Sequence, residues 1–121
     1  MTVGVAAASA NTFVDGVAGS SFLQFHIGDP GSAGTSNQAG STTRIAMTFP
    51  SSSGGSSTQT GTATLASWAG GSQTLSHFTL WSASSGGTFR ASGAFSVSRA
   101  VVNGDALNVS GIVISVSPVA A

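Results

Sequence analysis

Cysteine, lysine, glutamate and tyrosine are all absent from the 121-residue sequence. Without cysteine, the chain can form neither a disulfide framework nor a cysteine-based metal site. Without lysine, it cannot build the phosphate-binding loop of nucleotide hydrolases. Its three basic residues are all arginines, too few to neutralise many phosphates, so we expect no nucleic-acid partner.

Charge of either sign is also scarce. Charged residues make up 5% of the chain, whereas an average soluble domain has about 25%. A net charge of zero promotes association, and the abundant Ser, Thr, Gly and Ala give a neutral surface that packs closely. Because 40% of the residues are hydrophobic, we expect a folded chain rather than a disordered one. The composition therefore favours a protein that lies inside an assembly, although a neutral secreted domain is an alternative.

No apolar run approaches the roughly 20 residues that a membrane-spanning helix needs, so we expect no membrane partner. The length suits a single domain over residues 1–121, with an N-terminal helix or arm over 1–20 and a β-sandwich over 21–121.

An Ala-rich segment near the N-terminus, Val5–Ala18, predicts a short helix. Phe13 and Val17 are four residues apart and would lie on one face of it. The alternative is an extended arm, because Thr12, Asp15 and Gly16 are poor helix formers.

After residue 21 the hydrophobic pattern alternates with a period of two, which is typical of half-buried strands. Turn-forming residues separate the alternating segments, including Gly86-Gly87 and Asn103-Gly104-Asp105. The predicted strands are Phe22–Ile27, Arg44–Phe49, Thr60–Ala66, Ser76–Ser82, Phe89–Val97, Val97–Val102, Leu107–Val109 and Ile112–Val116.

Roughly six to eight short strands with at most one helix indicate an all-β fold, a single antiparallel β-sandwich of jelly-roll type. The parity of the strands predicts which side chains share the core. The predicted core residues are Leu23, Phe25, Ile27, Ile45, Met47, Phe49, Phe78 and Leu80.

Enzymatic chemistry finds little support in the sequence. Ser and His are present, but no G-x-S-x-G nucleophile elbow occurs. The three aspartates lie in or beside turn signals, where Asp hydrogen-bonds its own backbone. His26 and His77 have no acidic neighbours within their strands and no metal-ligand spacing. We therefore expect no enzyme, no catalytic residues, no metal site and no cofactor.

Three large side chains are candidates for contact with a partner. Trp68 and Trp81 could present aromatic rings to a sugar, although large aromatic residues in a small β domain are more often part of the core. His77 shares a strand face with Trp81. We consider Trp68, Trp81 and His77 as interface or glycan contacts.

Several segments, in order, resemble small tail fibre or minor tail proteins of actinobacteriophages and prophages. The segment FLQFHIGDPGSAG (22–34) is similar to the family's LHxGDPGxxG, and TTRIAMTF (42–49) is similar to YARxAVTF, with Arg44 at the matching arginine. The segment LSHFTLWSASSGG (75–87) is similar to VTHVGLWDAATGG. The pattern is broken at Thr43, where Tyr is common, and at Ser82, where Asp is common.

Two further segments extend the resemblance over most of the chain. Ala91–Phe95 with Asn103–Asp105 resembles the family's SGALT…VNAGD ending, and Asn11–Gly19 resembles its helical start. The resemblance implies a virion structural protein, a self-associating module of the tail fibre or minor tail, or of the capsid exterior. Head decoration that stabilises the shell is the first alternative, and a carbohydrate-binding adhesion module is the second. The implied partners are major capsid or tail proteins and further copies of the chain, with a trimer as one candidate.

Overall fold

A computed structural model describes residues 7–19 and 21–115. One helix, α1 (Ala7–Ala18), precedes eight strands in these residues. The strands are β1 (Ser21–His26), β2 (Ile45–Met47), β3 (Ser56–Thr58), β4 (Ala63–Leu65), β5 (Gln73–Trp81), β6 (Phe89–Val101), β7 (Leu107–Val109) and β8 (Val113–Ser115).

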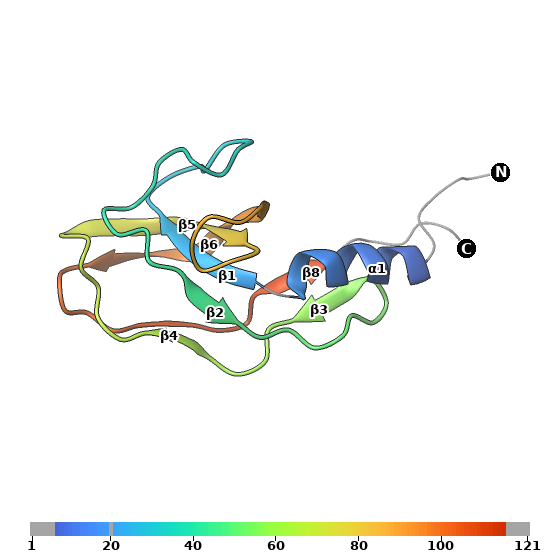
Figure 1. The fold of residues 1–121 in the computed structure, drawn as a ribbon. Helices are drawn as coiled ribbons and strands as arrows, with labels where there is room; N and C mark the ends of the chain where they lie inside the picture. Colours follow the sequence, from blue (N-terminus) through green and yellow to red (C-terminus); the bar gives the residue numbers. More distant parts are fainter. Residues whose placement is uncertain (1–6, 20, 116–121) are drawn as a thin grey trace.

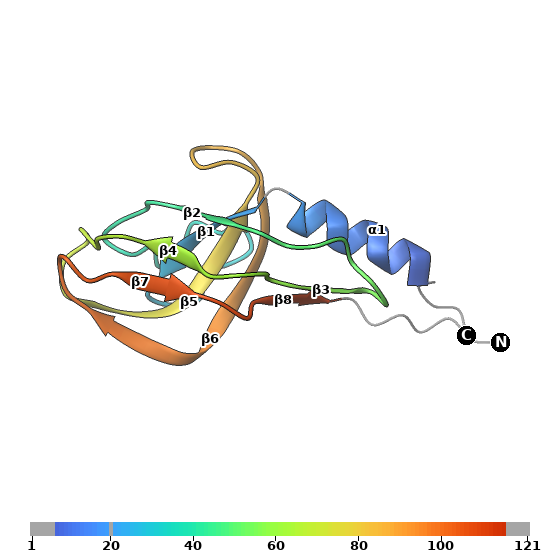
Figure 2. The same cartoon turned by 90° about the horizontal axis from the view of Figure 1, so that it is seen from below.

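The strands form an antiparallel sandwich, as the alternating pattern predicts. One layer is a four-stranded sheet in the order β2-β1-β5-β6, and the other consists of two separate pairs, β4-β7 and β3-β8. In the described residues, all the pairings between these strands are antiparallel. Figure 2 shows the β4-β7 pair across from β5 and β6, while α1 lies beside β3 and β8 at the far end.

The core lies between the two layers and draws side chains from both. On the larger sheet it contains Leu23, Phe25, Ile45, Met47, Leu75, Phe78, Leu80 and Val101. The smaller layer and the loops add Ala39, Ala63, Trp68, Leu107 and Val109. The predicted face of β5 is confirmed, because Phe78 and Leu80 both belong to this cluster.

Two members of the predicted core set behave differently from the rest. The prediction for Ile27 is wrong, since its side chain is 42% exposed. Strand β1 ends at His26, so the alternation stops before Ile27, which belongs to the following loop. Phe49 is only partly buried and packs against the edge of the core beyond the end of β2.

Helix α1 confirms the predicted N-terminal helix but buries a different face. Ala10, Val14 and Ala18 are buried, at the i, i+4 spacing of one helix face, whereas Phe13 is 64% exposed. The loop after β2 holds the helix, because the Ser52 backbone N–H donates to Asp15 Oδ1 at 2.8 Å. The first two residues of the predicted segment, Val5 and Ala6, lie outside the described residues.

Strand β3 was not predicted, because its Ser and Thr residues lie in and beside the Ser-rich stretch 51–57, which has no hydrophobic alternation. It is stabilised by pairing with β8, with Ser57 opposite Ile114. The two strands predicted over 89–102 form one strand, β6. Figure 1 shows β5 and β6 as the long strands of the larger sheet.

Gly93 explains how β6 crosses the ring of Phe78. The two residues are direct partners in the β5–β6 ladder. A Cβ at position 93 would lie 2.8 Å from Phe78 Cζ, closer than real carbon atoms approach one another. The close approach to the backbone at Gly93 is therefore made by an aromatic ring.

Candidate self-association edge and polar network

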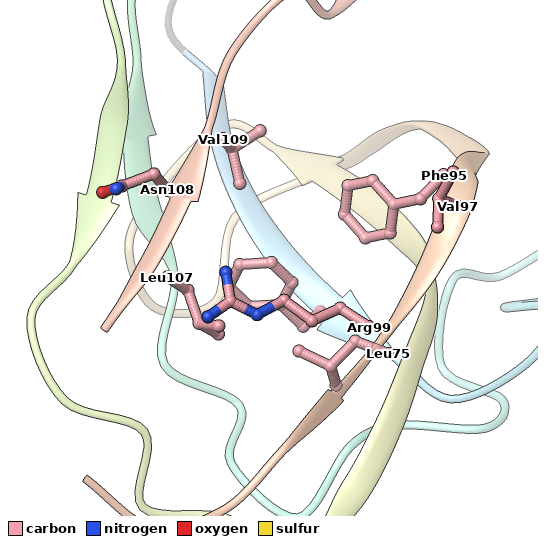
Figure 3. A pocket seen from close by; sticks show the side chains of 8 residues that line it. Leu75, Phe95, Val97, Arg99, Leu107, Asn108 and Val109 are labelled. Atoms are coloured by element: carbon pink, nitrogen blue, oxygen red, sulfur yellow. The ribbon is translucent and has the colours of Figure 1, made fainter. Parts of the chain in front are cut away.

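An open groove, here called the β6–β7 groove, separates the two layers on one side of the sandwich (Figure 3). Its volume is about 130 Å³. The lining residues are Phe25, Leu75, Phe95, Val97, Arg99, Leu107, Asn108 and Val109. Since four of these belong to the core cluster, the groove is a place where the core is not fully closed.

The groove exists because two strand edges face each other without pairing. Strand β6 is the last strand of its sheet, and β7 is paired only with β4 in the described part of the chain. At one end Arg99 Nη2 donates to the Ala106 carbonyl at 3.2 Å and bridges the two layers. Figure 3 shows Phe95 and Val97 on one side of the groove and Leu107 and Val109 on the other.

The middle of β6 leaves the ladder with β5. His77 is opposite Ala94, but Leu75 is opposite Arg99, so a single residue of β5 faces the segment 95–98. In that segment Val97 is 80% exposed. Ser96, Ser98, Arg99 and Ala100 are also exposed. An exposed strand edge is a template on which another strand can pair.

A second hollow continues along β6 toward β8. It is lined by residues of β5 and β6, among them Phe78, Phe95 and Val97, and by the segment 110–113. At its far side Val113 is exposed as well. The exposed apolar side chains of β6 and β8 therefore border one continuous open side of the sandwich.

A buried polar network covers the opposite face of the larger sheet. His26 Nδ1 lies 3.0 Å from the Ser36 carbonyl, and His26 Nε2 lies 2.9 Å from Thr79 Oγ1. Trp81 Nε1 donates to the same Thr79 oxygen at 2.7 Å. Because a carbonyl only accepts, Nδ1 carries the proton, and Nε2 of the neutral ring accepts the Thr79 hydroxyl proton. The network is therefore complete with His26 neutral.

Burial lowers the pKa of His26 below its ordinary value of 6.5, because the protonated ring loses solvation. The hydrogen bond to the Ser36 carbonyl acts in the opposite direction with a smaller effect. The charge of His77, its partner across β1 and β5, adds to the lowering.

We expect the free energy of unfolding to fall as the pH is lowered from about 7 to below 6. The unfolded chain binds a proton at His26 near pH 6.5, whereas the folded chain binds it only at lower pH. Stability is therefore fully present above 6.5 and is lost as the pH falls toward the folded pKa. Urea unfolding of the wild type and of His26→Gln across this range measures the effect. Equal pH dependence in both proteins would contradict the assignment to His26.

The structure places the three predicted contact residues at different depths. Trp68 is 1% exposed and lies in the core, where its ring meets Phe25 edge-on at 6.2 Å between centroids. Trp81 is 8% exposed, with the Arg44 guanidinium stacked 4.2 Å from its ring centroid. His77 is half-buried beside Ser76. The three do not form one surface, and neither indole offers an open platform for a sugar.

Neither the exposed side chain of Val97 nor the free edge of β6 was predicted from the sequence. A signal existed in the alternation of Phe95-Ser96-Val97-Ser98, which marks one apolar face of a strand. The alternation could not show that β6 would be an edge strand, because strand order depends on contacts distant in sequence.

In the described residues, no helix is both long and apolar enough to cross a membrane. The same residues contain no group of three or more His, Asp or Glu side chains that could hold a metal ion.

The comparison with protein families gives one match over nearly the whole chain. Residues 6–117 match the model of the family described as podophage GP4 fiber I protein gp80. No curated protein matches the chain.

Proposed function

The chain belongs to the family of podophage GP4 fiber I protein gp80, a virion fibre family, and we propose that it builds the fibre by associating with copies of itself along the open side of β6. The proposal rests on the exposure of Val97. This apolar side chain is 80% exposed on the unpaired edge of β6, beside the β6–β7 groove. A strand of a second copy laid along β6 would pair with its free edge and cover the β6–β7 groove.

The charge distribution favours a second copy as the occupant. Identical chains with a net charge of zero do not repel each other, and the groove contains one charged side chain, Arg99, whose Nη2 already bonds within the chain. A groove of this size has room for about one apolar side chain, since a cavity of roughly 150 Å³ accommodates benzene. The exposed valines of a neighbouring copy supply such side chains.

Strand β6 has few of the devices that keep sheet edges apart. Natural edges are protected by Lys, Pro, inward-pointing charges or bulges. Strand β6 contains no Lys and no Pro, and its two arginines, Arg90 and Arg99, lie toward its ends. The register shift near Phe95 bends the strand but leaves Val97 exposed at the middle of the edge.

Sedimentation velocity of the wild type and of Val97→Lys tests the proposal. We expect the wild type to associate as concentration rises and Val97→Lys to associate at least about tenfold more weakly, because a lysine would have to be desolvated in the interface. Ala46→Lys is the matched control, since Ala46 is exposed on β2 at the other edge of the same sheet.

The same experiment gives the stoichiometry, for which a trimer is one candidate. A wild type that stays monomeric at every concentration, or a Val97→Lys variant that associates as the wild type does, would contradict the proposal.

Several expectations from the sequence are more specific than the fibre family. The likeness to small actinobacteriophage and prophage tail proteins stays a prediction, as does the organisation of residues 1–121 as one domain. The fibre name of the family favours a fibre over head decoration. Both tryptophans are buried, so their exposure gives no support to sugar binding through their rings. Electron microscopy of the particle would distinguish fibre density from shell density for this chain.

A further inference from the structure

A polar hollow lies on the face of the larger sheet opposite the core. It has a volume of about 230 Å³ and is bordered by Gln38, Thr42 and Arg44 from the segment between β1 and β2, and by Ser84 and Ser85 from the β5–β6 turn. This site, here called the Arg44 hollow, is lined by hydroxyl, amide and guanidinium groups, and it is separate from the β6–β7 groove.

Arg44 is held rigidly at this hollow. Its Nε donates to Gln24 Oε1 at 3.1 Å, and its Nη1 donates to the carbonyls of Ala83 and Gly86 at 2.8 and 2.7 Å. The guanidinium stacks on Trp81. In the part of the chain that the structure describes, Nη2 has no hydrogen-bond acceptor. The two N–H groups of Nη2 are therefore available to a ligand.

Within the residues that the structure describes, no carboxylate neutralises the charge of Arg44. Its hydrogen-bond partners are an amide and two carbonyls, all neutral. The three aspartates of the chain each accept a backbone N–H elsewhere, from Ser52, Gly31 and Val102. A partly desolvated cation without a counterion attracts an anion more strongly than one in bulk water. Burial also lowers the pKa of Arg44, although arginine stays charged at neutral pH.

We propose that the Arg44 hollow binds a carboxylate-bearing sugar, with the carboxylate on Nη2 of Arg44 and the sugar hydroxyls on Gln38, Thr42, Ser84 and Ser85. One guanidinium matches one negative charge, which favours a uronic acid over a doubly charged phosphate. Hydroxyl and amide groups both donate and accept, as sugar hydroxyls require. The hollow is smaller than a drug-sized pocket and would hold about one sugar unit. The binding chemistry stands on this geometry alone, and only its use at a host surface rests on the fibre function.

The two tryptophans provide a direct measurement. A ¹⁵N-labelled protein gives one indole N–H signal from Trp81, beneath Arg44, and one from Trp68, in the core. Substituting each by Phe assigns the two signals. We expect glucuronate to shift the Trp81 signal saturably in the millimolar range and to leave the Trp68 signal unchanged. Acetate, which lacks the hydroxyls, should bind at least about fivefold more weakly, and neutral glucose should give no shift.

The site can also be tested by a variant that blocks it and keeps Arg44 unchanged. Ser85→Glu would put a carboxylate beside the guanidinium and should weaken glucuronate binding at least tenfold, while Ser85→Gln, of the same size but neutral, should retain it. Circular dichroism checks that both variants are folded. Repeating the titration in Val97→Lys separates this site from self-association, because binding should be unchanged there even if the fibre proposal fails.

Three results would overturn the proposal. They are the absence of a Trp81 shift with glucuronate, equal affinities for acetate and glucuronate, which would mean a general anion site only, and full binding by Ser85→Glu.

Discussion

Replacing Trp68 by alanine should lower the free energy of unfolding by about 3–5 kcal/mol. The indole fills the core against Phe25, and its Nε1 donates to the Gly71 carbonyl at 2.7 Å. The backbone of Trp68 also joins the 67–71 segment to the turn before β7, by bonds to Asp105 at 2.8 Å and from Gly104 at 2.7 Å. The side chain and the turn therefore support each other at one end of the sandwich.

Denaturant unfolding measures this loss of stability. The variant Trp68→Phe separates the contribution of ring packing from that of the hydrogen bond to Gly71. The phenylalanine keeps an aromatic ring against Phe25 but loses the hydrogen bond to Gly71, so its cost should be clearly smaller than that of Trp68→Ala. A loss below about 1 kcal/mol for Trp68→Ala would mean that the indole does not fill the core as described.

Phe78→Ala should also cost about 3–5 kcal/mol. Its ring lies over Gly93, packs against Phe95 at 5.1 Å between centroids and belongs to the core cluster. Phe13→Ala is the matched control, because Phe13 is exposed on α1 and should change stability by no more than about 0.5 kcal/mol. The two variants are compared by urea unfolding at low protein concentration. A loss below about 1 kcal/mol for Phe78→Ala would mean that this face of β5 does not point into the core.

The alternating pattern was sufficient to predict strands of the larger sheet and their buried faces, but not their order in the sheet. Phe78 and Leu80 lie on the predicted face of β5, β2 falls within its predicted segment, and β1 begins and ends one residue before its own. These predictions depend only on the period of side chains along a strand. Ile27 fails the same test because the pattern does not say where the strand ends.

Elements that depend on distant partners could not be predicted. Strand β3 is made of Ser and Thr and acquires its strand conformation from pairing with β8, about 55 residues later in the chain. On α1 the sequence offered Phe13 and Val17 as one face, but the surface beneath the helix accepts Ala10 and Val14 instead.

For the candidate sites, too, the sequence indicated individual residues but not the contacts that depend on the fold. Trp68 and Trp81 were visible in the sequence as unusual residues, but their burial depends on the whole fold. Arg44 was visible as a motif residue, whereas its stacking on Trp81 and its bonds to the β5–β6 turn needed the structure. The scarcity of charge predicted association, and the strand order leaves β6 as the edge at which the proposed association would occur.

Backbone hydrogen exchange in β6 tests the central claim most directly. If copies join along this edge, the amides of residues 95–100 should exchange more slowly at concentrations where the protein is assembled than where it is monomeric. The amides of residues 91–94, in the regular part of the ladder with β5, serve as the internal reference. Rapid, concentration-independent exchange at 95–100 in protein that sedimentation shows to be assembled would contradict the account.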